Sequence, residues 1–250
     1  MDIQFMTAGD RIHRHFYKTM VLQRNQDIDT VIGNLIDTMD IKAVIFDLDG
    51  TLIDNNSVHL LAWKKYLLQE GIDISDEAYR ININGRTNKD ALEFIYQKKM
   101  TDDEAMRYAL EKEAVYRDIY KSTIKPVDGL SGLLEAFYQK HIPMAIATSG
   151  IQVNIDFMFE HIPIKKYFKY IVNSAHISKG KPDPEIYLKT AELLKVSSEN
   201  CLVFEDAVVG VRAAHAAGMK VIAITTTQSK EELKDAELII ADFTVQSFCH

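Results

Sequence analysis

The sequence of 250 residues predicts an α/β fold, in which helices cover both faces of a parallel β-sheet and an all-helical segment is inserted after the first strand. Two observations predict it. Short apolar segments alternate with helical patterns in the second half of the chain, and strands of this kind are buried in a parallel sheet. Residues 56–124, by contrast, show helical patterning without a proline or a convincing strand. We therefore expect a sheet-based core that is interrupted by a helical insertion.

An N-terminal extension, residues 1–40, precedes the first expected strand, and we expect it to be helical in part. Apolar residues recur in it at the spacing of an amphipathic helix, at Ile28, Val31, Ile32, Leu35, Ile36 and Met39. Asp27 is placed to cap this helix. The helix either packs on the body of the protein or forms a surface for a partner, and we assign it no catalytic role.

The core elements follow in order along the chain. The expected strands are 43–45, 143–147, 170–172, 201–204, 221–224 and 238–240, and the expected core helices are 153–161, 184–194 and 209–217. Gly218 follows the last helix, where glycine often ends a helix in the left-handed conformation. This assignment gives a core domain of residues 41–55 and 125–250 and a helical domain of residues 56–124.

Composition argues against several classes of protein. The net charge of −7 argues against binding to a nucleic-acid backbone, which normally requires a basic stripe. No apolar segment approaches the roughly 20 residues that cross a bilayer, and the N-terminus lacks the apolar region of a signal peptide. We expect a cytoplasmic protein without a nucleic-acid or membrane partner, in which Cys201 is a buried, reduced thiol.

Two carboxylates follow the first expected strand. Asp47 and Asp49 lie two residues apart, so they share one side of the chain if the strand stays extended, and Gly50 then turns the chain. Two carboxylates this close need a positive charge nearby if both are to ionise. Taken alone, the pair is also compatible with a turn and a helix cap.

Polar residues follow two further strands. Thr148 and Ser149 follow the second strand and Glu205 and Asp206 follow the fourth, while Lys181 lies in a loop before a helix. Parallel sheets bind ligands at the carboxyl ends of their strands. Carboxylate oxygens suit Mg²⁺, and hydroxyl, backbone N–H and lysine groups suit a phosphoryl group. The two acidic residues are alternatively the charged start of a helix, and the lysine alternatively a solvated side chain.

In these motifs the chain resembles the haloacid dehalogenase superfamily, and within it the β-phosphoglucomutase-like sugar phosphatases with a type-one cap. The resemblance extends from Lys42 to the end of the chain and includes four motifs in order, at 47–51, 147–150, Lys181 within 180–184, and 204–211. It implies a Rossmann-like parallel sheet core with an inserted all-helical cap domain. It also implies an enzyme that acts on a small phosphorylated metabolite, with Mg²⁺ as its cofactor.

The resemblance implies a role for each carboxylate. Asp47 is the expected nucleophile, which forms an aspartyl-phosphate, and Asp49 is the expected general acid and base. Mg²⁺ is expected between the Asp47 carboxylate, the Asp49 carbonyl and Asp206, with Glu205 close by.

The remaining motif residues are expected to hold the phosphoryl group. Thr148 and Ser149 are expected to bind its oxygens with nearby backbone amides. Lys181 is expected to offset the negative charge of the nucleophile and the phosphate.

The helical domain must choose the substrate, because the core recognises only phosphate and metal. The expected substrate-binding residues, besides Ser149, are His59 and the loop residues Gly85, Arg86, Thr87 and Asn88. Gly85 permits a close approach, and Arg86 can bind phosphate or sugar hydroxyls. The loop is alternatively a helix start with surface charges, and His59 is alternatively a residue of helix packing.

Two departures from the mutase pattern favour a phosphatase. Gly150-Ile151-Gln152 stands where mutases have Ser-Lys-Asn, and Asn88 lines up with the mutase arginine. A mutase must hold a bisphosphate in two orientations, so the loss of distal phosphate ligands weakens that interpretation. We expect a phosphatase, with a sugar phosphomutase as the alternative and a non-catalytic binding protein less favoured. We expect a monomer or a weak homodimer.

Overall fold

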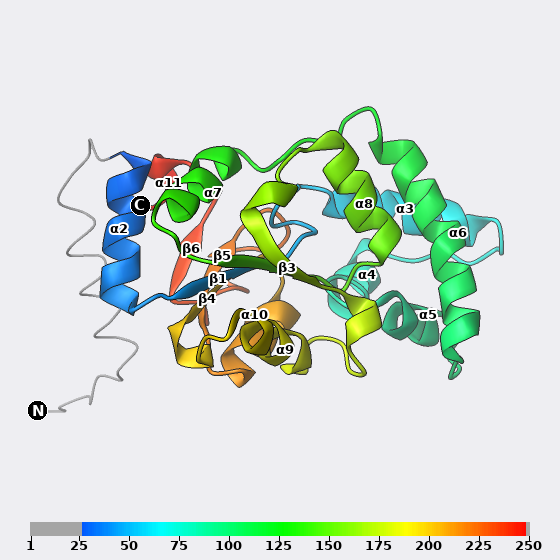
Figure 1. Ribbon diagram of the computed structural model, residues 1–250. Helices are drawn as coiled ribbons and strands as arrows, with labels where there is room; N and C mark the ends of the chain where they lie inside the picture. Colours follow the sequence, from blue (N-terminus) through cyan, green and yellow to red (C-terminus); the bar gives the residue numbers. More distant parts are fainter. Residues whose placement is uncertain (1–26, 249–250) are drawn as a thin grey trace, which may run out of the picture.

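The computed structural model describes residues 27–248, which form a parallel β-sheet with flanking helices and a separate group of helices beside it (Figure 1). The six strands lie in the order β3-β2-β1-β4-β5-β6, and every pairing is parallel. Their bounds are β1 Ala43–Phe46, β2 Met144–Ala147, β3 Phe168–Val172, β4 Cys201–Glu205, β5 Lys220–Ile224 and β6 Leu238–Ile240. The predicted α/β fold is confirmed, and each expected strand lies at its expected place with small differences at the ends.

Helices cover both faces of the sheet because successive strand residues point to opposite sides. Val44 and Phe46 of β1 belong to one buried apolar cluster, and Ala43 and Ile45 belong to a second. In Figure 1, α7 and α8 lie above the sheet, and α9 and α10 lie below it. The helices of the core are α2 Ile28–Met39, α7 Leu130–Gln139, α8 Gln152–His161, α9 Glu185–Leu194, α10 Val208–Ala216 and α11 Val245–Phe248, with short 3₁₀ turns η1 Lys165–Tyr167, η2 Ser174–His176 and η3 Ser198–Asn200.

The helix expected in the N-terminal extension is present as α2. Asp27 caps it by accepting a hydrogen bond from the N–H of Thr30 at 2.9 Å. Val31, Leu35 and other buried residues of α2 belong to the main apolar cluster, and the helix lies against α7 and α11. It therefore packs on the body of the protein, which is one of the two expected alternatives. Residues 1–26 of the extension lie outside the described residues.

Between β1 and β2 the chain forms four helices, which we call the helical insertion: α3 Asn56–Leu68, α4 Asp76–Asn82, α5 Asn88–Tyr96 and α6 Asp102–Tyr120. Ser75, Thr87 and Thr101 cap α4, α5 and α6, each by accepting a hydrogen bond from the N–H three residues on. The insertion has its own buried apolar cluster, which includes Trp63 and Leu92. The exact boundary between the insertion and the core stays a prediction.

The strand order brings three strand ends together. β1 pairs with β2 on one side and with β4 on the other, so the direction of winding reverses at β1. Sheets of this kind bind ligands at the carboxyl ends of the strands beside such a reversal. The residues that follow β1, β2 and β4 therefore meet at one edge of the sheet, on the side where the helical insertion lies (Figure 1).

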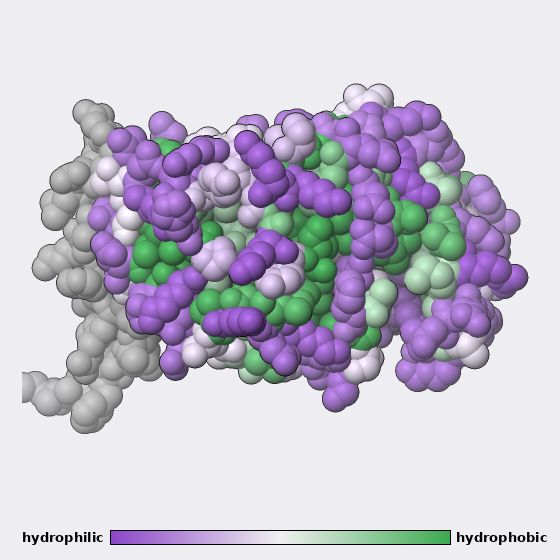
Figure 2. Space-filling view, viewed as in Figure 1, coloured by the Kyte–Doolittle hydropathy of each residue, from purple (hydrophilic) through white to green (hydrophobic). Residues whose placement is uncertain are grey.

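Hydrophilic side chains cover most of the face shown in Figure 2, with smaller apolar areas between them. None of the described helices has the length and apolarity required to span a bilayer. Cys201 is buried and its thiol is free, as the sequence predicts.

Candidate active site

A buried lysine joins two neighbouring strand ends. Lys181 lies in the loop before α9, and its Nζ donates to Oδ1 of Asp47 and to Oε1 of Glu205, both at 2.6 Å. Asp47 directly follows β1 and Glu205 ends β4, and these two strands are paired. Lys181 is 2% exposed, so water does not solvate its ammonium group. The two carboxylates stabilise its charge instead. The structure thus brings together three residues that the sequence places far apart.

Glu205 accepts hydrogen bonds from four protein groups. Its Oε1 accepts hydrogen bonds from Lys181 and from the hydroxyl of Tyr187, and its Oε2 accepts from the N–H groups of Asp206 and Ala207. These four protein donors occupy the acceptor positions of a carboxylate. Glu205 therefore holds Lys181 in place, and its expected position among the metal ligands stays a prediction.

The cluster contains more acidic groups than basic ones. Burial raises the pKa of Asp47 to about 8 in spite of Lys181, and the charges of Glu205 and Asp49 add to the rise. Burial also raises the pKa of Asp206 well above its ordinary value, again with help from Glu205 and Asp47. Burial disfavours the charged form of Lys181, but the two carboxylates outweigh it and raise its pKa well above the ordinary value. One lysine does not balance the group, and a cation beside Asp47 and Asp206 would restore their ionised forms.

Asp206 packs against the turn that follows β1. Gly50 has a φ of +80°, and a Cβ on it would lie 2.1 Å from Oδ2 of Asp206, so only glycine fits at this position. The same Oδ2 accepts a hydrogen bond from Nδ2 of Asn56 at 2.9 Å. The backbone after Asp49 and the carboxylate of Asp206 therefore share one buried corner, and carboxylate and carbonyl oxygens are the ligands that suit Mg²⁺.

Asp49 is held by residues at the start of the helical insertion. Its Oδ1 accepts a hydrogen bond from Nδ2 of Asn55 at 2.6 Å and lies 3.4 Å from Nε2 of His59. The imidazole of His59 stacks on the ring of Tyr116 with 3.9 Å between ring centres. Burial alone would raise the pKa of Asp49, but His59 and Asn55 outweigh burial and hold that pKa below its ordinary value. Asp47 and Asp49 therefore have pKa shifts of opposite sign.

Asp47 and Asp49 line a cavity of about 60 Å³ between the core and the helical insertion. Thr148 and Ser149 line it from the core, and the two sides touch where Oγ of Ser149 donates to the carbonyl oxygen of Gly85 at 3.0 Å. Ligand pockets usually measure roughly 300–1,000 Å³. In this structure the insertion lies against the core, and the cavity between them is smaller than a usual ligand pocket.

Most of the expected substrate-binding residues line this cavity: His59, Gly85, Arg86, Asn88 and Ser149. Thr87 does not, because its hydroxyl caps α5 and donates to Oδ2 of Asp90 at 2.6 Å. For Thr87 the alternative of a helix start is the better description. Nε of Arg86 and Nδ2 of Asn84 are buried without a hydrogen-bond partner among the described residues. Buried donors of this kind normally have a partner, so a ligand in the cavity would satisfy them.

Several buried polar residues of the cavity wall are absent from the sequence predictions, among them Lys112, Glu113 and Asn154. Lys112 and Glu113 lie on α6 and are 1% and 2% exposed, and Asn154 lies on α8. A signal for the first two exists in the sequence. The buried apolar residues of α6 recur at helical spacing at Ala105, Ala109, Tyr116 and Tyr120. Lys112 and Glu113 occupy the turn of that face where apolar residues are expected.

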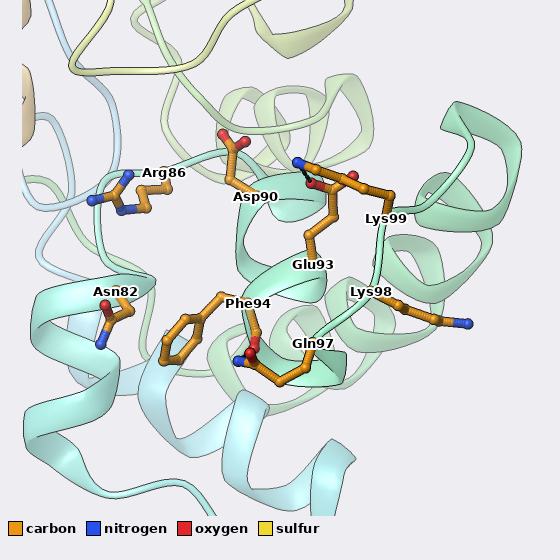
Figure 3. Close-up of a pocket in the computed structure, with 8 residues that line it drawn as sticks. All are labelled: Asn82, Arg86, Asp90, Glu93, Phe94, Gln97, Lys98 and Lys99. Atoms are coloured by element: carbon orange, nitrogen blue, oxygen red, sulfur yellow. Dashed lines mark hydrogen bonds and ion pairs between the residues drawn. The ribbon is translucent and has the colours of Figure 1, made fainter.

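A larger hollow of about 520 Å³ lies on the helical insertion and shares Arg86 with the cavity (Figure 3). Asn82 at the end of α4 and Phe94 on α5 line it. Glu93 and Lys99 on its rim form an ion pair at 2.6 Å. Arg86 therefore stands between the enclosed cavity and an open part of the surface.

Comparison with known proteins points to one family. A family model described as haloacid dehalogenase-like hydrolase matches residues 44–224. The chain is 29% identical to the fructose-1-phosphate phosphatase of Escherichia coli, over 72% of this chain and 94% of that protein. It is 32% identical to the β-phosphoglucomutase of Bacillus subtilis, over 82% of this chain and 92% of that protein. Among solved structures, a family IA hydrolase from Entamoeba histolytica is similar with a TM-score of 0.73 and 36% identity, over 84% of this chain and 98% of that one.

Proposed function

Since this chain belongs to the haloacid dehalogenase-like hydrolase family, we propose that it is a Mg²⁺-dependent phosphatase that hydrolyses a small phosphorylated metabolite of the sugar phosphate class through an aspartyl-phosphate on Asp47. One observation carries the proposal. A buried lysine holds the carboxylate of Asp47 at the edge of a cavity into which a second carboxylate, Asp49, also opens. Phosphatases that act on sugar phosphates are among the relatives of the chain, which supports the substrate class.

Asp47 is the proposed nucleophile. Its carboxylate oxygen attacks phosphorus in line, so that a new P–O bond forms while the bond from phosphorus to the substrate oxygen breaks. Lys181, bonded to Oδ1 of Asp47, fixes the carboxylate and offsets the charge that collects on the phosphoryl oxygens. Thr148 and the neighbouring backbone N–H groups are the proposed ligands of those oxygens.

Asp49 is the proposed acid and base. The negative charge of an arriving phosphate raises the pKa of Asp49, which allows its carboxyl group to donate a proton to the leaving oxygen. In the second step the Asp49 carboxylate takes a proton from water, the water oxygen attacks phosphorus, and the bond to Asp47 breaks. Asn55 and His59, which contact Oδ1, keep the carboxyl group directed into the cavity.

Three oxygens are proposed to hold Mg²⁺: the carboxylates of Asp47 and Asp206 and the backbone carbonyl of Asp49. Within residues 27–248 no three His, Cys, Asp or Glu side chains converge as a ready-made metal site. Mg²⁺ sites that use one or two carboxylates and leave positions for water and substrate phosphate agree with this smaller set. The ion would supply positive charge next to the transferring phosphoryl group.

Removal of the metal is expected to stop turnover. We expect EDTA to lower phosphate release from p-nitrophenyl phosphate and from a panel of sugar phosphates by roughly 100-fold or more, because several kcal/mol of charge stabilisation are lost. Added Mg²⁺ should restore release. Turnover that survives EDTA would remove the metal from the mechanism.

We propose that the helical insertion is the cap that selects the substrate and that Arg86 binds it. Arg86→Ala is expected to raise KM by roughly tenfold to a hundredfold, because a charge-assisted hydrogen bond contributes about 1.5–3 kcal/mol. Steady-state kinetics on the same panel measure the change. Arg107→Ala, on the exposed surface of α6, is the matched control. If Arg86→Ala leaves KM and substrate preference unchanged, Arg86 does not bind the substrate and is only a surface charge.

A sugar phosphomutase is the second candidate, because the β-phosphoglucomutase of Bacillus subtilis is 32% identical to the chain. The two functions differ in what leaves the active site. A phosphatase releases phosphate, whereas a mutase returns it to a second hydroxyl of the sugar. Isomerisation of β-glucose 1-phosphate, followed in the same assays as phosphate release, distinguishes them, and release without isomerisation is the result that we expect.

A further inference from the structure

A buried ion pair forms part of the cavity wall. Lys112 and Glu113 are successive residues of α6, and Nζ of Lys112 donates to Oε1 of Glu113 at 2.6 Å. Asn88 donates to the same oxygen at 3.0 Å, and Asn154 donates to Oε2 at 2.7 Å. A carboxylate has about four acceptor positions, so these three donors leave one position of Glu113 for a ligand hydroxyl.

Glu113 is separated from Asp49 by a single side chain. His59 stands between it and Asp49, because Nε2 of His59 is 3.4 Å from Oδ1 of Asp49 and Nδ1 is 3.8 Å from Oε2 of Glu113. One imidazole ring therefore separates Glu113 from the proposed acid and base. Since Asp49 acts on the oxygen that joins phosphorus to the alcohol, Glu113 faces the alcohol portion of the substrate.

This part of the cavity wall carries no net positive charge. Burial would raise the pKa of Glu113, but Lys112 outweighs burial and the pKa falls to about 2, so the carboxylate is ionised at neutral pH. Its charge cancels that of Lys112. Arg86 is the other lysine or arginine among the described residues of the wall, and it forms no ion pair with Glu113 in that part of the chain. Among the described residues, the only lysine or arginine that contacts Glu113 is therefore Lys112, whose charge Glu113 already balances.

We infer that Glu113 is a specificity-determining residue, which accepts a hydrogen bond from a hydroxyl of the alcohol portion and disfavours substrates with a second phosphate there. The inference rests on the proposed function and narrows its substrate class to monophosphates of neutral sugars or polyols. A second phosphate would lose its hydration in a small cavity beside an ion pair that offers it no net positive charge. A hydroxyl, by contrast, donates to the same carboxylate in a charge-assisted hydrogen bond.

The kcat/KM values for fructose 1-phosphate and fructose 1,6-bisphosphate, measured by phosphate release, test the inference. Glu113→Gln leaves the charge of Lys112 uncompensated, so we expect the ratio of bisphosphate to monophosphate to rise roughly tenfold. Lys112→Met leaves the charge of Glu113 uncompensated, so this substitution should lower the same ratio. The ratio cancels any general loss of activity. Asp118→Asn, an exposed carboxylate of the same helix that pairs with Lys121, is the control and should leave the ratio unchanged.

The possible results of these assays either support or overturn the role of Glu113. A wild-type enzyme that prefers the bisphosphate, or a ratio that both variants leave unchanged, overturns the role of Glu113 while the phosphatase function stands. A wild-type enzyme that releases no phosphate from any phosphomonoester, p-nitrophenyl phosphate included, overturns both. Thermal unfolding establishes that the variants are folded. If Glu113→Gln does not fold, Lys112→Met decides alone, and an unchanged or raised ratio overturns the inference.

Discussion

Asp47→Asn is expected to lower phosphate release on the order of 10⁴-fold or more, which is the scale of removing a nucleophile from an enzyme. The amide of asparagine does not attack phosphorus, and it is a weaker metal ligand than a carboxylate. The fold should survive, because asparagine has nearly the same shape and Lys181 keeps its hydrogen bond to Glu205. Phosphate release from the best substrate of the panel and thermal unfolding of the variant measure the two effects separately.

The matched control is Asp54→Asn, an exposed aspartate of the same loop, which should retain wild-type activity. Retained activity in Asp47→Asn, in a preparation free of deamidated protein, would remove the aspartyl-phosphate from the mechanism. A variant that loses both its activity and its cooperative unfolding transition would instead assign Asp47 to the stability of the fold.

Lys181→Met is expected to affect both stability and activity. The substitution leaves Asp47 and Glu205 buried without their shared cation, and breaking a buried pair in this way costs about 3–5 kcal/mol. Turnover should fall by roughly 100-fold or more, because the transition state loses a positioned positive charge. Urea unfolding and kcat measured on the folded fraction test the two parts.

A double variant separates the charge of Lys181 from its packing. Lys181→Met combined with Glu205→Gln removes the lysine and one of its carboxylate partners, so part of the lost stability should return. Lys179→Met is the control, since this exposed lysine forms only a surface pair with Asp183 at 3.6 Å, and such pairs contribute about 0–1 kcal/mol. A stability of Lys181→Met within about 1 kcal/mol of the wild type would contradict a strong dependence on this buried cluster.

The sheet and the residues at its edge were predictable from the sequence for a physical reason. Parallel strands buried on both faces are apolar throughout, so their ends are marked by the first polar residue, as at Asp47 after β1 and Thr148 after β2. Because these strand ends meet at one edge, the sequence also predicts that Asp206 and Lys181 lie near them. The contact of Lys181 with Asp47 bears out that expectation, while the catalytic roles stay proposals.

The pairing of polar side chains within the site was not predictable from residue type alone. Glu205 and Asp206 are neighbours with the same charge, yet Glu205 binds Lys181 while Asp206 packs against Gly50. The difference depends on the register of β4 and on the turn after it. The role of Thr87 was not predictable for the same reason. A loop threonine that caps a helix has the same sequence pattern as one that binds substrate.

The helical insertion was predicted as a set of helices but not as a wall with specific contacts. α6 is rich in acidic and basic residues, so Lys112 and Glu113 resemble the solvated charges around them. Their burial depends on α3 and α8, which approach α6 from distant parts of the sequence. Reading the buried face of α6 by its spacing, and not by its composition, would have singled out this pair.

The most direct test of the aspartyl-phosphate mechanism is to locate the phosphoryl group on the protein during turnover. The enzyme, mixed with Mg²⁺ and its best substrate, is quenched in acid within the first turnover, reduced with borohydride and digested for mass spectrometry. Borohydride reduces an aspartyl-phosphate to homoserine. We predict homoserine at position 47 in the wild-type enzyme and none without substrate. Phosphate release at the full rate while Asp47 stays unmodified, or a modification at another side chain, would contradict the account.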